Sequence, residues 1–179
     1  MLFRSQEEIK ILYEEMWYSD WYLIGSDYPN DSIGGQGWSF TKYFDVDKES
    51  NQIYRNILNK ISELPQIKDK YVCERSLRNA YKFGDLIGLH KDVCYEITAL
   101  IYGNKEWKIN WGAETIFTDS ESQDSEIIKS VIPKPGRLVL FDSLIPHTGR
   151  VPSSAFPNYR YSLVYNFNPK PVQIESGGK

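Results

Sequence analysis

The sequence predicts a mainly β fold, a sandwich or barrel of short strands with helices covering one face. Aromatic residues make up 15% of the 179 residues, including 13 Tyr and 5 Trp, and aromatic side chains favour strands. From about residue 69 onward, short β-type runs recur between turn signals: KYVCERSL, YEITALIYG, EWKINWG, ETIFT, EIIKSVIP, RLVLFD and RYSLVYNF. Many short strands at close spacing are typical of a sandwich or a barrel.

Two amphipathic helices are expected before these strands. Residues 6–17 and 51–64 carry apolar side chains at helical spacing, and Pro65 would end the second helix. The apolar faces consist of Ile9, Leu12 and Met16 in the first helix and Ile53, Ile57, Ile61 and Leu64 in the second. Between the helices, the Gly-containing run DYPNDSIGGQGWSF (27–40) predicts a long loop.

The length suits one domain with one core. We expect helical support over about 1–68, the barrel over about 69–168 and a loose tail after it. The net charge of −3 makes nucleic acid an unlikely partner. No apolar run is long enough to span a bilayer, the N-terminus does not resemble a signal peptide, and the two cysteines are expected to be reduced, so we expect a cytoplasmic protein. The sequence predicts no oligomeric state.

The two histidines of the chain both lie where they could bind a metal. His90 precedes Asp92 by two residues, and residues i and i+2 of an extended chain point to the same side. His147 follows the β-type run RLVLFD and could complete a set of two histidines and one carboxylate, the facial arrangement of non-haem iron oxygenases. An HxD pair also occurs often by chance, and ordinary polar loop residues are the alternative.

The last β-type run contains a candidate anion site. Arg160 and Ser162 share one face of a strand, and a guanidinium with a neighbouring hydroxyl matches a carboxylate. The pair could hold a dicarboxylate from its far end, although a surface arginine on an edge strand is the alternative. Arg150 is a rival anchor, ranked lower because it lies outside this alternating strand.

The stretch from about Tyr81 to Phe167 resembles the 2-oxoglutarate/Fe(II) dioxygenases of the prolyl 4-hydroxylase-like group. The matching pieces occur in the family's order: GDLIGLHKD, ITALIYGN with EWKINWGAETIF, IPKPGRLVLFDSLIPHTGRVP and YRYSLVYNF. The second piece resembles the family pattern W-G-G-E-T-x-F, with Ala113 in place of one glycine.

The resemblance implies a double-stranded β-helix, a jelly-roll or cupin-like barrel, with Fe(II), 2-oxoglutarate and O2 as the reaction's requirements. It implies oxidative decarboxylation of 2-oxoglutarate coupled to hydroxylation. Related halogenases have a small residue where this chain has Asp92, so a carboxylate there favours hydroxylation over halogenation, while desaturation and ring closure stay open as outcomes. The implied site residues are His90, Asp92 and His147 for iron, and Arg160 with Ser162, and Tyr81 or Tyr102, for 2-oxoglutarate.

Several readings stay open at this stage. A cupin-like barrel that binds a metal or sugar without redox chemistry is the main rival, and an inactive scaffold is a second. Trp107 and Trp111 are expected to pack the barrel or its cover, and Glu114 could contact substrate or fix a loop. The acidic run 114–126 predicts a solvated loop or a lid. The expected substrate is a small polar metabolite, an amino acid or a peptidyl side chain.

Overall fold

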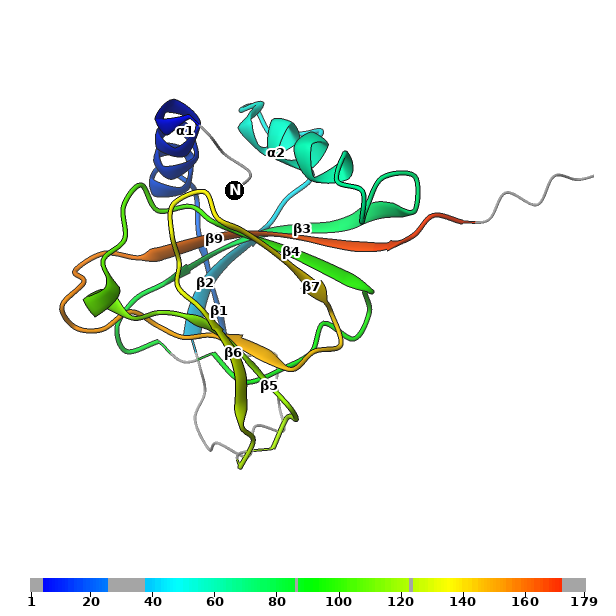
Figure 1. The fold of residues 1–179 in the computed structure, drawn as a ribbon. Coiled ribbons are helices and arrows are strands. Elements are labelled where there is room, and N and C mark those ends of the chain that lie inside the picture. Colours follow the sequence, from blue (N-terminus) through cyan, green and yellow to red (C-terminus); the bar gives the residue numbers. More distant parts are fainter. Residues whose placement is uncertain (1–4, 26–37, 86, 123, 172–179) are drawn as a thin grey trace, which may run out of the picture.

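Two antiparallel β-sheets face each other in the computed structural model, which describes residues 5–25, 38–85, 87–122 and 124–171. Figure 1 shows both helices lying over the outer face of the larger sheet, with the smaller sheet on its other side. The elements are α1 (Gln6–Trp17), β1 (Tyr22–Gly25), β2 (Trp38–Tyr43), α2 (Ile53–Ser62), β3 (Tyr71–Tyr81), β4 (Ile97–Tyr102), the 3₁₀ turn η1 (Ile109–Trp111), β5 (Thr115–Thr118), β6 (Ile127–Val131), β7 (Leu138–Asp142), β8 (His147–Gly149) and β9 (Arg160–Pro169).

The larger sheet has the strand order β1-β2-β3-β9-β4-β7, and the smaller sheet has the order β6-β5-β8. β9 lies between β3 and β4, so the last strand of the chain occupies the interior of the larger sheet. An isolated bridge between His90 and His147 adds one further rung beside β8. The mainly β fold with covering helices is therefore confirmed.

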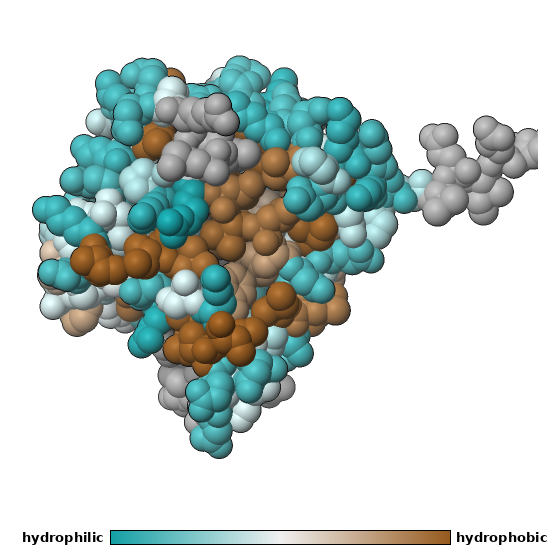
Figure 2. All heavy atoms as spheres, viewed as in Figure 1, coloured by the Kyte–Doolittle hydropathy of each residue, from teal (hydrophilic) through white to brown (hydrophobic). Residues whose placement is uncertain are grey.

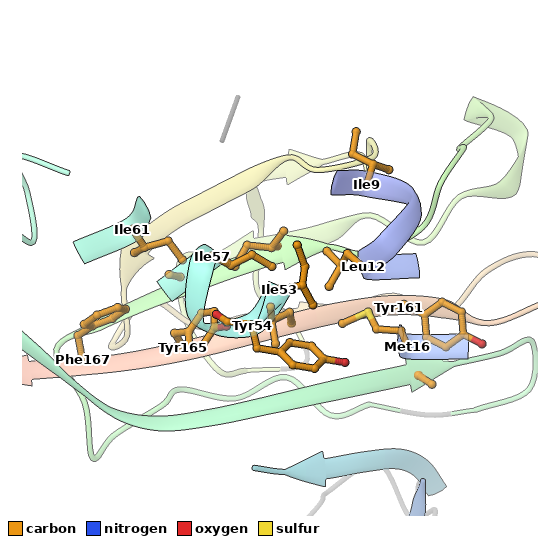
Figure 3. Close-up of a cluster of buried hydrophobic side chains, with 14 of the residues drawn as sticks. Ile9, Leu12, Met16, Ile53, Tyr54, Ile57, Ile61, Tyr161, Tyr165 and Phe167 are labelled. Carbon is orange, nitrogen blue, oxygen red and sulfur yellow. The ribbon is translucent and has the colours of Figure 1, made fainter. Parts of the chain in front are cut away.

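Alternation along β9 separates the hydrophobic core from the interior between the sheets. One set of side chains packs under the helices: Tyr161, Leu163, Tyr165 and Phe167. Figure 3 shows three of these rings beneath the apolar side chains of α1 and α2. The intervening residues Arg160, Ser162, Val164 and Asn166 belong to the opposite face, and Arg160 reaches Thr115 of the smaller sheet.

The helices form where the apolar spacing predicts them. Ser5 caps α1 by accepting a hydrogen bond from the Glu8 backbone N–H at 3.1 Å. Ile57 is fully buried in α2, and Met16 is fully buried in α1. Each such aliphatic side chain contributes roughly 1.5–3 kcal/mol through its removal from water. Helix packing on the sheet is therefore the main source of helix stability.

Two of the expected elements differ in the structure, and a third lies mostly outside the described residues. The run EWKINWG is not a strand: it forms η1 within a loop, and inside this loop Trp107 Nε1 donates to the carbonyl of Gly112 at 3.1 Å. Residues before 69 are not only helical, because β1 and β2 extend the larger sheet beyond β3. The expected loop 27–40 lies outside the described residues up to 37, and its last three residues begin β2.

The surface of the described residues is mixed. On the face drawn in Figure 2, polar side chains cover the helices, whereas apolar residues gather below them, over the region of β4 and β7 in Figure 1. Cys73 and Cys94 are both free thiols, as expected. Neither of the two described helices is long and apolar enough to cross a membrane.

Candidate active site

His90 and His147 lie side by side on one antiparallel rung. Each backbone N–H donates to the other residue's carbonyl, at 3.0 Å and 2.9 Å. The ring centroids are 4.5 Å apart. The two residues are 57 positions apart in sequence, yet they meet because the fold pairs the segment before β4 with β8. The structure brings the two predicted histidines together.

Both imidazoles are oriented by a backbone carbonyl two residues earlier. Nδ1 of His90 lies 2.9 Å from the carbonyl of Gly88, and Nδ1 of His147 lies 2.9 Å from that of Ile145. A carbonyl only accepts, so each Nδ1 carries a proton, and in the neutral ring this hydrogen bond leaves Nε2 as the nitrogen available for metal ligation. Burial and the neighbouring His90 lower the pKa of His147 to about 4. The His147 ring is therefore neutral at neutral pH.

Asp92 lies beside this pair and is held by several donors. Its Oδ2 is 3.9 Å from His147 Nε2 and accepts a hydrogen bond from Thr98 Oγ1 at 2.8 Å. Its Oδ1 accepts from Arg75 Nη2 at 2.9 Å. Burial raises the pKa of the Asp92 carboxyl, but the Thr98 hydrogen bond and the Arg75 charge outweigh it and hold this pKa below its usual range. Asp92 is therefore an ionised, oriented carboxylate.

Two imidazole nitrogens and one carboxylate oxygen form a donor set that fits Fe(II). Ligands sharing one octahedral metal are about 3 Å apart when each bond is about 2.1 Å, slightly less than the 3.9 Å between Asp92 and His147. Accordingly, within the described part of the chain, no three His, Cys, Asp or Glu side chains already form a closed cluster.

Arg160 is fully buried on the same inner face of the larger sheet. Its partners are neutral: Nε donates to the Ala113 carbonyl at 3.1 Å, Nη2 to Thr115 Oγ1 at 3.0 Å, and Nη1 to Ser162 Oγ at 3.4 Å. Within the described residues, no carboxylate balances its charge. A guanidinium has five N–H donors, so each Nη keeps a donor for an additional acceptor. A buried cation with unused donors is a site for an anion.

Two tyrosines enclose this guanidinium. The Arg160 carbon Cζ lies 5.5 Å from the ring centroid of Tyr81 and 5.1 Å from that of Tyr102. Tyr102 is also the cross-strand partner of Ser162, and its hydroxyl lies 2.7 Å from Thr115 Oγ1. The structure therefore places all four predicted cosubstrate residues together. The rival Arg150 is instead exposed at the end of β8.

Other predicted residues lie around the site. Trp107 and Trp111 pack edge to face and both contact the ring of Phe156, so they belong to a loop cluster outside the sheets. The acidic run continues from β5 into an exposed turn, where Glu121 forms a 3.0 Å ion pair with Lys91, the residue between His90 and Asp92. Glu114 is half-buried beside this strand.

Sequence reasoning missed several residues that support the site. Arg75, Thr98 and Asn166 hold Asp92 from three strands. Gly149 leaves room for Arg160, because a Cβ at this position would meet the guanidinium Nη1 at 3.3 Å. Asn166 had a signal, since it continues the alternation of Arg160 and Ser162 along β9.

The sequence matches the 2OG-Fe(II) oxygenase superfamily over residues 78–178, more than half of the chain. The chain therefore belongs to this superfamily, whose metal is Fe(II) and whose cosubstrate is 2-oxoglutarate. Membership overturns the alternative of a non-redox cupin-like barrel. No curated protein sequence matches the chain significantly.

Solved structures share the fold at low sequence identity. A Pseudomonas putida prolyl-4-hydroxylase is 15% identical with a TM-score of 0.62, covering 93% of this chain and 89% of that one. The viral collagen prolyl hydroxylase of Paramecium Bursaria Chlorella virus-1, in a 2OG complex, is 18% identical with a TM-score of 0.61 and 92% coverage of both chains. The alpha-ketoglutarate-dependent epimerase SnoN of nogalamycin biosynthesis is 13% identical with a TM-score of 0.62, covering 99% and 84%. These similarities confirm the double-stranded β-helix fold.

Proposed function

We propose that this chain couples oxidative decarboxylation of 2-oxoglutarate to hydroxylation of a small polar metabolite, an amino acid or a peptidyl side chain. In this proposal His90, Asp92 and His147 hold the iron. Arg160 binds the distal carboxylate of 2-oxoglutarate, and Ser162, with Tyr81 or Tyr102, completes its pocket. Iron and 2-oxoglutarate, when bound, supply the oxidising chemistry.

The buried guanidinium of Arg160 is the observation that carries the proposal. It has only neutral partners among the described residues, and it lies on the same inner face as Asn166, which hydrogen-bonds Asp92. A dicarboxylate could thus meet Arg160 with one end and a metal with the other. The carboxylate that meets Arg160 would neutralise the charge of the guanidinium, which is costly to bury without a counter-charge.

The chain's own residues supply position and shielding. The Nδ1 hydrogen bonds of the two histidines occupy one ring nitrogen each, so Nε2 would be the nitrogen that holds a bound metal. The ring of Phe141 packs edge to face on His147 at 4.7 Å, and Phe117 packs on Phe141 at 4.9 Å. This apolar wall would limit water beside the metal and so favour reaction with a bound substrate.

The substrate class rests on two kinds of support. The net charge of −3 disfavours a surface that follows nucleic-acid phosphates. The structural neighbours named as prolyl hydroxylases make a peptidyl or amino-acid side chain the nearest analogy. One structural neighbour is named as an epimerase and not as a hydroxylase. The test must therefore follow the transfer of oxygen from O2 to the product as well as the turnover of 2-oxoglutarate.

The test starts without oxygen. Anaerobic Fe(II) and 2-oxoglutarate should give a weak visible charge-transfer band with the wild-type protein and none with His147→Ala. Succinate release is then screened with amino acids, proline-containing peptides, nucleosides, nucleic acids and lipids under ¹⁸O₂. One ¹⁸O atom in an amino acid or peptide supports the proposal. Stimulation by nucleic acid alone would refute the substrate class, and a product without ¹⁸O would refute hydroxylation.

A further inference from the structure

The two carboxylate oxygens of Asp92 face different groups. Oδ1 accepts from Arg75 Nη2 at 2.9 Å. Oδ2 accepts from Thr98 Oγ1 at 2.8 Å and from Asn166 Nδ2 at 3.1 Å, and it is the oxygen that lies 3.9 Å from His147 Nε2. Oδ2 is therefore the oxygen that faces His147, and the other oxygen is occupied by the Arg75 guanidinium.

The groups that hold Asp92 form one row across three strands of the larger sheet. Arg75 of β3 is the register partner of Asn166 in β9, and Asn166 is the register partner of Thr98 in β4. They also bond to one another: Arg75 Nε donates to Asn166 Oδ1 at 2.8 Å, and Asn166 Nδ2 donates to Thr98 Oγ1 at 2.8 Å. Each member is thus fixed by its neighbour and by the sheet.

An irregularity in β3 puts Arg75 into this row. Cys73 pairs with Phe167, yet Arg75 pairs with the next residue of β9, Asn166, so Glu74 is an extra residue in the ladder. In a regular ladder Arg75 would be opposite Tyr165, whose side chain lies on the helix side of the sheet. The bulge therefore turns Arg75 to the inner face, as bulges beside active sites often redirect a side chain.

Arg75 has a second restraint on its position. Its guanidinium carbon lies 4.6 Å from the ring centroid of Tyr95, and the ion pair with Asp92 is only partly exposed, with side-chain exposures of 26% and 12%. A shielded, stacked and doubly hydrogen-bonded arginine is held far more firmly than a surface ion pair. Its contact with Oδ1 is therefore restrained from two sides, by the hydrogen bond to Asn166 and by the ring of Tyr95.

Resting on the proposed metal role of Asp92, we infer that Arg75 is a positioning residue that keeps Oδ1 away from the metal, so that Asp92 ligates through Oδ2 alone. A carboxylate that used both oxygens would occupy one more coordination position. A site with two histidines and one single-oxygen carboxylate leaves three positions open. Arg75 thus keeps free a position that 2-oxoglutarate or oxygen requires.

If Arg75 has this role, its removal should raise the metal affinity of the site and not lower it. A nearby guanidinium repels a dication and withholds one ligand oxygen, so its removal should strengthen metal binding. A residue that merely supported the fold would do the opposite, because its loss would loosen Asp92 and weaken binding. The direction of the change therefore separates the two roles.

The experiment titrates the full chain with Mn(II) alone and measures the free Mn(II) signal by electron paramagnetic resonance and the water-proton relaxation of the bound ion. Arg75→Met should bind Mn(II) about tenfold more tightly, with lower water-proton relaxation because fewer waters remain on the ion. The matched control is Arg55→Met, which removes another 2.9 Å arginine–aspartate pair, with Asp47, outside the row. This control should match the wild type in both measurements.

Unchanged or weaker Mn(II) binding by folded Arg75→Met would overturn the inference. If Arg75→Met has a lowered melting temperature, Arg75→Gln replaces it in the test, because glutamine can donate a hydrogen bond to Asn166 without carrying a charge. Arg75→Gln should then show the same tighter Mn(II) binding. Asp92→Ala tests the underlying proposal separately. If Asp92→Ala binds Mn(II) as the wild type does, the metal role of Asp92 fails; if it loses binding while Arg75→Met is unchanged, only the Arg75 inference fails.

Discussion

Replacement of Arg160 by leucine should raise the KM for 2-oxoglutarate far more than replacement of Arg150. Arg160 is fully buried and has only neutral partners among the described residues, whereas Arg150 is exposed. Loss of one partner of a buried charge pair costs about 2–5 kcal/mol. At 1.4 kcal/mol for each tenfold change, KM should rise roughly 30-fold to several thousand-fold for Arg160→Leu.

The matched variant sets the scale of this effect. An exposed ion pair contributes about 0–1 kcal/mol, so Arg150→Leu should raise KM by less than about fivefold. Initial rates of succinate release at increasing 2-oxoglutarate give both constants, and thermal melts show whether each variant is folded. Arg160→Lys should fall between the wild type and Arg160→Leu, because an ammonium keeps the charge but lacks the planar fork. An equal rise in both leucine variants, or a larger rise for Arg150→Leu, would refute the assignment of Arg160.

Three further outcomes are expected. Asp92→Ala and His147→Ala should each weaken Fe(II) binding by at least about a hundredfold, measured by anaerobic titration, since each removes one of the three proposed ligands; wild-type affinity in both would show that the ligands lie elsewhere. In the metal-free protein, the His147 pKa of about 4 lies below that of a histidine in the unfolded chain. The neutral His147 ring therefore contributes fully to the free energy of unfolding above pH 6.5. This contribution is lost as the pH falls towards 4, by roughly 3 kcal/mol at most. Denaturant titrations should therefore show a flatter pH dependence for His147→Gln, and parallel curves would contradict this. Ile57→Ala, a cavity in the helix–sheet core, should cost about 2–5 kcal/mol of stability with 2-oxoglutarate binding unchanged; a loss below 1 kcal/mol would contradict the observed packing.

Local patterns predicted the parts of the fold that local forces determine. The apolar spacing of Ile9, Leu12 and Met16 predicted α1 because a helix buries residues three and four apart. The run EWKINWG misled because Trp107, Ile109 and Trp111 alternate as in a strand, while the Trp side chains pack in a loop cluster with Phe156. Alternating apolar residues are compatible with a strand, but a strand forms only where a neighbouring segment supplies backbone hydrogen bonds.

The site was predictable to the extent that its residues lie at strand ends near chemical motifs. An HxD pair and a histidine after a strand predicted His90, Asp92 and His147, which the structure places near one another. Arg75 could not be found in this way, because its inward direction depends on the extra residue in β3 relative to β9. This register depends on two strands that lie about 90 residues apart in sequence, so it cannot be predicted from the residues of either strand alone.

β9 links the stability of the fold to the chemistry of the site. Its outward residues, such as Tyr165 and Phe167, are fully buried under the helices, while its inward residues Arg160 and Asn166 are equally buried around the anion and carboxylate positions. Burial of the inward polar groups is costly unless every partner is present. The apolar side of the strand, packed against α1 and α2, supplies the favourable burial that offsets this cost. Because side chains alternate, a shift of one residue in β9 would exchange the two sets and remove both the core and the site.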